Sequence, residues 1–155
     1  MKNFLISSLF FLLLFSLTPN SLISGPYSLP EPIELSQLIK ECDYVARVTI
    51  DEVHHKKIKT GLLSASMEVT VKRAFKAETP LPPKIELSFI VNQRQYGKSL
   101  VSLPEKGEYI LFMNRKIFLF FFGKKFESFI LYEPHPFAIQ NYSGELENKI
   151  IKILK

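Results

Sequence analysis

Three stretches of the chain alternate between apolar and polar residues, and this alternation limits the fold more than any other feature. It runs through residues 43–53, 67–75 and 85–91. Successive side chains of a strand point to opposite faces of a sheet, so a period of two indicates a strand with one buried face. Three such strands in succession predict a mainly β domain.

One alternating set in each stretch is apolar and is expected to face the core. The opposite set is charged or hydroxylated, as at Arg47, Thr49 and Asp51. The predicted core residues of the three strands are Tyr44, Ala46, Val48, Ile50, Met67, Val69, Val71, Phe75, Ile85, Leu87, Phe89 and Val91.

Later segments predict further antiparallel strands. Residues 108–114 are apolar on both faces, which is typical of a central strand covered on both sides. Residues 117–122 and 126–132, joined by a glycine-containing turn at 123–125, predict a hairpin. After Pro134 and Pro136, residues 137–140 predict a short strand.

Two short helices are predicted at the ends of this β region. Residues 33–41 have apolar positions at helical spacing, and residues 143–155 follow the same period with Ser143 as N-cap. The connections are polar or rich in proline. Among them, residues 54–64 are expected to form a basic loop.

The N-terminus has the pattern of a secretory signal. Lys2 precedes an apolar run at 4–17, which is shorter than the about 20 residues of a spanning helix. We therefore predict a signal peptide at 1–24, an extended leader at 25–33 and one domain at 34–155, acting outside the cytoplasm. An uncleaved leader that tethers the protein to the membrane is the alternative. Cys42 lies too far downstream for a lipoprotein.

Charge and cysteine content narrow the function further. The 155 residues carry a net charge of +5, a mild excess without the basic clustering of a nucleic-acid binder. We therefore expect no nucleic-acid partner. The single cysteine, Cys42, ends an apolar-periodic segment and is expected to be buried. An intermolecular disulfide is the alternative, and the oligomeric state stays open.

Four strings carry a resemblance to a known family. Residues 43–50, 71–76, 107–112 and 129–139 resemble strands of exported bacterial domains with an OB-type barrel. Those domains are similar in fold to the netrin module and to tissue inhibitors of metalloproteinases. The resemblance implies an OB-like antiparallel β-barrel with a short N-terminal and a C-terminal helix. Because no cysteine precedes Cys42, none of the inhibitory residues can be carried over.

The motifs of common catalytic sites are absent. The chain lacks G-x-S-x-G, H-E-x-x-H, G-x-x-x-x-G-K-S/T and G-x-G-x-x-G. His54 and His55 are adjacent, so in an extended chain they point to opposite sides and do not share a metal. We predict no catalytic residues, no metal and no cofactor. The alternative is a hydrolytic or metal-dependent enzyme that uses His135 with Glu133.

The densest positive charge predicts a binding surface. It comprises His54, His55, Lys56, Lys57 and Lys59. In an OB-type barrel the loop between the first two strands lies on the ligand-facing side. The residues are therefore candidates for binding an anionic partner, such as a lipid headgroup, a polyanionic glycan or an acidic protein surface. A solvated loop is the alternative.

A second candidate surface comes from the phenylalanine-rich hairpin. Phe118, Phe120 and Phe122 occur with Phe121 and Phe126, so both faces of this hairpin are apolar. One face can enter the core, and the other needs cover from the C-terminal helix, a partner or lipid. We expect the helix to cover it.

Together these features predict an exported, non-enzymatic binding domain. Its partner is expected to be a protein or an anionic component of the cell envelope. Membrane contact is expected only through an uncleaved signal segment. A small envelope enzyme and a protease inhibitor are the alternatives.

Overall fold

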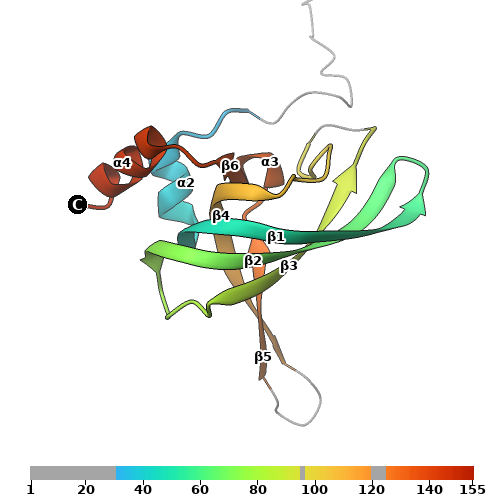
Figure 1. Ribbon diagram of the computed structural model, residues 1–155, viewed down its shortest axis with the longest axis horizontal. Helices are drawn as coiled ribbons and strands as arrows, with labels where there is room; N and C mark the ends of the chain where they lie inside the picture. The colour runs from blue at the N-terminus through green and yellow to red at the C-terminus, as the bar shows by residue number, and fades with distance from the viewer. Residues whose placement is uncertain (1–30, 95–96, 120–124) are drawn as a thin grey trace, which may run out of the picture.

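The computed structural model describes residues 31–94, 97–119 and 125–155, without the side chains of 118, 119, 125 and 126. The predicted signal peptide and most of the leader lie outside the described residues. The elements follow in the order α2 (Leu35–Glu41), β1 (Tyr44–Lys59), β2 (Leu62–Ala77), β3 (Lys84–Asn92), β4 (Gly107–Leu119), β5 (Lys125–Leu131), α3 (His135–Ala138), β6 (Ile139–Asn141) and α4 (Gly144–Ile153) (Figure 1).

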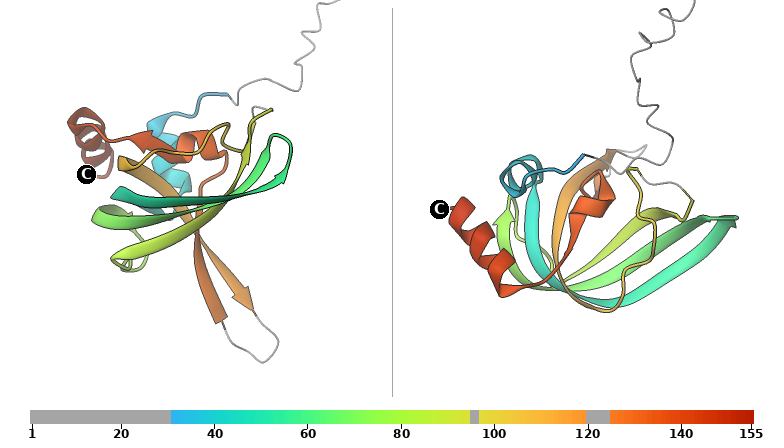
Figure 2. Two further views of the ribbon diagram at one scale, coloured as in Figure 1. Left: turned by 45° about the vertical axis from the view of Figure 1, so that its right-hand side comes forward. Right: turned by 90° about the horizontal axis from the view of Figure 1, so that it is seen from above.

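The strands form one antiparallel sheet. Its order is β3-β2-β1-β4-β5, and β6 pairs with β4. Strands β1 to β3 follow one another as hairpins, and β4 returns to lie beside β1, which is a Greek-key connection. The sheet curls so that β3 and β5 approach each other, without a ladder between them in the described residues (Figure 2). The prediction of a mainly β fold with short helices is confirmed.

The alternation of the sequence is reproduced as burial. In β3, the side chains of Ile85, Leu87, Phe89 and Val91 are buried while the intervening ones are exposed. The first three residues of β1 are buried on both faces, since Tyr44, Val45 and Ala46 are all inaccessible. A fully buried side chain of this size contributes about 1.5–3 kcal/mol, so this shared core dominates the stability.

Strand β4 is central, as its sequence predicts. It pairs with β1, β5 and β6, and Ile110, Leu111, Phe112 and Met113 are fully buried. It is also longer than predicted. Residues 117–119 continue β4 and do not form a separate strand, because the ladder with β5 runs unbroken from Met113 to Leu119.

The prediction of a basic loop at 54–64 is wrong. Strand β1 continues to Lys59, β2 begins at Leu62, and only Thr60 and Gly61 separate them. Residues 54–59 of β1 are exposed and have β2 as their single neighbouring strand in the described residues, so their side chains need no apolar period. Backbone hydrogen bonds define β1 here, and the side-chain pattern therefore does not reveal it.

The predicted short strand at 137–140 is also corrected. Residues His135–Ala138 form the helical turn α3, and the strand β6 begins only at Ile139. Pro136 lies in the first turn of α3, where the missing N–H of proline costs no hydrogen bond. Ile139 pairs with Leu111 of β4.

Contacts from β2 and from the end of β5 hold α2 in place. The Lys76 ammonium donates to the carbonyls of Ile39 (2.8 Å), Lys40 (3.2 Å) and Cys42 at the end of the helix. The Tyr132 hydroxyl, just past β5, donates to the Glu41 carboxylate. This bond, helped by burial, raises the pKa of Tyr132 to about 12.

Cys42 is buried, as predicted. Only 1% of its surface is exposed, and the thiol donates to the Ile39 carbonyl at 3.6 Å. Burial raises the pKa of the Cys42 thiol to about 11. The thiol is therefore protonated at neutral pH and serves as a small core residue.

Helix α4 closes the chain beside α2. The Ser143 side chain accepts from the Leu146 N–H, which confirms the predicted N-cap. Glu147 binds Arg73 at 2.7 Å and accepts from the Tyr142 hydroxyl at 2.9 Å. These contacts attach the first turn of α4 to the outer face of the sheet.

The expectation that α4 covers the phenylalanine-rich hairpin is wrong. Helix α4 lies next to α2 at one end of the molecule, whereas β5 and the end of β4 extend away from it (Figure 1). The reason is the register of β6, which pairs with Tyr109–Leu111 near the start of β4 and so leads the chain to that end.

Within the residues that the structure describes, no helix is long and apolar enough to cross a membrane.

Candidate binding surface on the β1–β2 hairpin

The outer part of the β1–β2 hairpin projects from the body of the sheet. Strand β1 pairs with β4 only from Tyr44 to Ile50, so residues 51–59 have β2 as their single neighbouring strand. A register shift lies between Ile50 and Glu52, at the point where β4 leaves β1. Such bulges bend and twist a strand. Beyond this point the hairpin, here called the ribbon, is the edge of the three-stranded β1–β2–β3 meander, because β2 pairs with β3 from Leu62 to Thr70 (Figure 2).

The turn of the hairpin brings in an arginine from elsewhere in the chain. Gly61 has a φ of +78°, a conformation that side chains with a Cβ rarely adopt. A Cβ added there would lie 2.6 Å from Cγ of Arg94, and the Gly61 carbonyl accepts from the Gln93 N–H at 2.8 Å. Arg94 thus lies against the turn and adds a cation to it.

The predicted binding residues lie on both faces of the ribbon. His54 pairs with Ser66, and Lys56 pairs with Ser64. Both serines point to the outer face of β2, so His54 and Lys56 point to that face as well. His55 and Lys57 point to the other face, as expected for neighbours in an extended chain. We name the following exposed residues the basic tip: His54, His55, Lys56, Lys57, Lys59 and Arg94.

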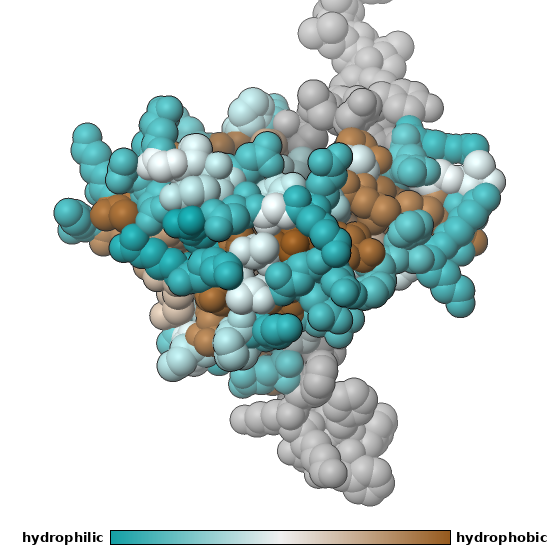
Figure 3. Space-filling model, viewed as in Figure 1, coloured by the Kyte–Doolittle hydropathy of each residue, from teal (hydrophilic) through white to brown (hydrophobic). Residues whose placement is uncertain are grey.

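The lysines of the basic tip have no acidic partner among the described residues. No ion pair is formed by Lys56, Lys57 or Lys59, whereas Arg73 and Arg115 in the body of the sheet both pair with glutamates. Ile58 lies among these lysines with 54% of its surface exposed. Hydrophilic side chains predominate at this end of the molecule, next to a group of hydrophobic ones (at the right of Figure 3).

A shallow hollow of about 310 Å³ lies on the outer face beside the basic tip. It spans all three strands of the β1–β2–β3 meander. Its lining is polar apart from Ala65, with hydroxyl groups from β2 and β3 and a carboxylate from β3. The lining residues are His54, His55, Lys56, Ser64, Ala65, Ser66, Glu86 and Ser88.

Sequence reasoning missed two sets of residues at this surface. Arg94 is far from the lysines in sequence and reaches the tip only through the fold. The outward carboxylates of Glu52, Glu68 and Glu86 lie in one row across the three strands. Alternation identifies Glu68 and Glu86 as outward residues, but it does not specify which residues of neighbouring strands are opposite each other.

The phenylalanine candidates fall largely outside the described residues. Phe120 and Phe122 lie wholly outside them, and for Phe118 only the backbone is described, in β4 opposite Phe126. Phe129 of β5 packs on Tyr44 with ring centroids 5.3 Å apart and planes at 80°. This part of the hairpin is therefore attached to the core.

The structure places both residues of the alternative enzymatic pair, His135 and Glu133, next to Lys98. The His135 backbone N–H donates to the Lys98 carbonyl, and its Nδ1 is buried without a partner in the described residues. Burial lowers the pKa of His135. The Glu133 carboxylate points to Lys98 at 4.0 Å, and no hydrogen bond joins it to the imidazole.

Comparison with known protein families finds no matching family model, and comparison with curated proteins finds no match. The function is therefore argued from the surface itself.

Proposed function

We propose that the chain is an exported, non-enzymatic binding domain that binds an anionic component of the cell envelope through the basic tip. The observation that carries the proposal is a set of exposed lysines, at 56, 57 and 59 on the projecting ribbon, that form no ion pair with any described residue. When a binding partner covers such a lysine, the free-energy cost of removing its water is offset only by a negative charge on that partner. The tip therefore favours an anionic partner.

The strand order supports an OB-type arrangement. OB folds are five-stranded, partly open Greek-key barrels. The order β3-β2-β1-β4-β5, with β3 and β5 approaching each other, agrees with this description. In such barrels the connection between strands 1 and 2 contributes to ligand binding, and in this chain the basic tip occupies that position. The similarity in fold to the netrin module belongs to the same proposal.

Anionic lipid is the envelope component that the tip fits best. Lysines next to a membrane surface are attracted by about 1 kcal/mol each. Ile58, more than half exposed among them, offers an apolar side chain for the headgroup boundary. Export through the signal segment at 1–24 would place the domain beside such a surface.

The test compares vesicles of zwitterionic lipid with vesicles in which about one lipid in three is anionic. The anionic lipid gives the vesicle surface a negative potential. We expect the purified chain to co-sediment only with the anionic vesicles, and salt to weaken this binding. Replacing Lys56, Lys57 and Lys59 together with Gln should weaken it up to about a hundredfold, from about 1 kcal/mol per lysine.

A matched control removes the same charge elsewhere. Lys72, Lys106 and Lys152 are exposed, and none of them forms an ion pair within the described part of the chain. Replacing these three with Gln should leave binding within about twofold of the original, since long-range charge effects are screened. Equal losses of binding in both triple variants would show that binding depends only on the net charge of the protein. No binding to anionic vesicles would contradict the lipid proposal, and immobilised heparin would then test the glycan.

A further inference from the structure

A row of three carboxylates crosses the outer face of the sheet. Glu52 of β1 lies directly opposite Glu68 of β2, and Glu68 lies directly opposite Glu86 of β3. All three residues are exposed. Like charges directly opposite each other on neighbouring strands destabilise a sheet. A cation bound between two of these side chains would remove that repulsion.

The row has no basic partner of its own within the described residues. None of the three carboxylates pairs with a lysine or an arginine, and Glu52 contacts only His54. The other glutamates on the sheet do pair: Glu108 with Arg47, and Glu127 with Arg115. Because the chain carries a net charge of +5, a shortage of cations does not explain this difference.

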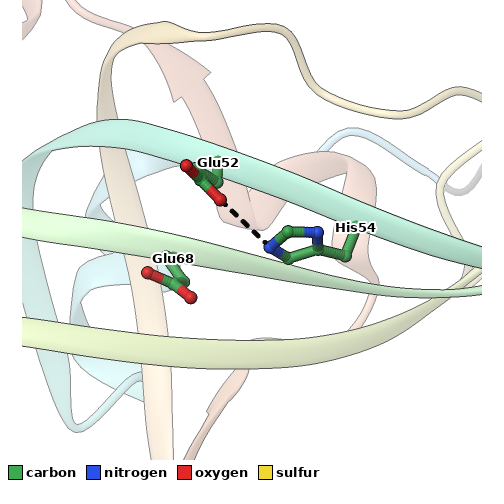
Figure 4. A group of neighbouring side chains, drawn as sticks. All are labelled: Glu52, His54 and Glu68. Atoms are coloured by element: carbon green, nitrogen blue, oxygen red, sulfur yellow. Dashed lines mark ion pairs between the residues drawn. The ribbon is translucent and has the colours of Figure 1, made fainter.

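His54 adds a nitrogen donor beside the carboxylates (Figure 4). It follows Glu52 by two residues on β1, so both side chains reach the outer face. Its Nε2 lies 3.3 Å from a Glu52 carboxylate oxygen. One potential ligand atom from each of Glu52, His54 and Glu68 lies within 4.8 Å of the others.

These separations suit a metal ion of a particular kind. Two ligands of a tetrahedral Zn²⁺, each 2.0–2.2 Å from the ion, are roughly 3.3–3.6 Å apart. Glu52 and His54 have this spacing. The Glu68 ligand atom lies within 4.8 Å of both, and rotation of this exposed side chain would bring it to the same spacing. Imidazole with carboxylates suits Zn²⁺, Cu²⁺ or Ni²⁺, whereas Mg²⁺ and Ca²⁺ favour oxygen ligands alone.

We propose that Glu52, His54 and Glu68 form a surface binding site for a divalent transition-metal ion, with Zn²⁺ as the ion to test. The adjoining hollow leaves room for water in the remaining coordination positions. Glu86 adds negative charge next to Glu68 without being a ligand. Lys56 lies on the same face, and His54 separates it from the carboxylates along β1. The site shares His54 with the basic tip, but the lysines that carry the function proposed for the tip are not among its ligands.

The test is calorimetric titration of ZnCl₂ into the full chain without a polyhistidine tag. We expect one ion per chain. Replacing His54 or Glu68 with Gln should weaken binding on the order of tenfold or more, since even loss of an outer-shell partner costs that much. His55→Gln is the matched control, because His55 adjoins His54 but is not one of the three residues whose ligand atoms lie together.

Thermal unfolding gives a second readout that separates metal binding from folding. Without metal, Glu68→Gln should unfold at the same or a higher temperature than the unchanged chain, since a repulsion is removed. With Zn²⁺, only the unchanged chain and His55→Gln should gain stability. The proposal is overturned by the absence of stoichiometric binding, by equal losses in His54→Gln and His55→Gln, or by equal competition from Mg²⁺. If Glu68→Gln does not fold, Glu52→Gln takes its place.

Discussion

At the scale of the residue, the Lys76 side chain caps the C-terminal end of α2. The last carbonyls of any helix lack backbone donors. At the end of α2 the Lys76 ammonium supplies donors to the carbonyls of Ile39, Lys40 and Cys42. Its charge also meets the negative end of the short helix. One side chain of β2 therefore fixes the position of α2 against the sheet.

We expect Lys76→Met to destabilise the fold. The variant keeps most of the aliphatic chain but loses three donated hydrogen bonds, and a hydrogen bond to a charged group contributes about 1.5–3 kcal/mol. Urea unfolding followed by circular dichroism measures the loss. Lys72→Met, at an exposed position of the same strand, should change the stability by less than about 0.5 kcal/mol. Similar values for both variants would show that the cap contributes nothing.

At the scale of the element, the β1–β2 hairpin depends on its turn. Beyond Ile50, strand β1 lacks the β4 ladder, so its register is maintained by the β2 ladder and by the turn. Gly61 supplies the positive φ, and Arg94 packs where a Cβ would lie. The positions of the basic tip and of the Glu52–Glu68 pair both follow from this register.

Gly61→Ala should therefore destabilise the chain by about 1–2 kcal/mol, the cost of a left-handed conformation for a residue with a Cβ. Urea unfolding measures it. The double variant Gly61→Ala with Arg94→Ala separates the two causes, because it relieves the close contact and leaves the backbone strain. Gly144→Ala is the control, since that glycine has no neighbour within 4 Å. An equal effect at Gly144 would contradict the role of the turn.

At the scale of the whole molecule, the sheet has a tightly bound half and a projecting half. Residues 44–50 of β1 pair with strands on both sides and are largely buried, whereas residues 51–59 pair on one side and are mostly exposed. Protection of amides from exchange with solvent follows hydrogen bonding and burial. The two halves of one strand should therefore open with different free energies.

Hydrogen exchange read by mass spectrometry of peptides checks this difference. We expect peptides covering 44–50 to exchange only through global unfolding, and peptides covering 52–59 to exchange much faster through local opening. Strand β3 is the comparison, since it pairs only with β2 in the described residues but buries alternate side chains. Equal protection of both halves of β1 would show that the projecting ribbon is covered in solution.

Much of the body of the fold could be predicted from the sequence. Alternation identified the inward residues of β3 and the buried half of β1, because each inward position there must exclude water. Helix α4 was predicted from its apolar period and from Ser143 as its cap. These features are local, since the period of side chains along a strand or helix is set by the backbone alone.

The strand register and the end of the molecule that α4 reaches were decided by the tertiary structure. Residues 54–59 are a strand although their side chains have no apolar period, because ladder hydrogen bonds with β2 need only backbone groups. Register brings Glu52 opposite Glu68, and the turn brings Arg94 to the lysines. The sequence by itself determined which faces of β1, β2 and β3 are buried, while pairing between distant segments decided which charges meet. Such pairing depends on backbone geometry and on packing of the whole core.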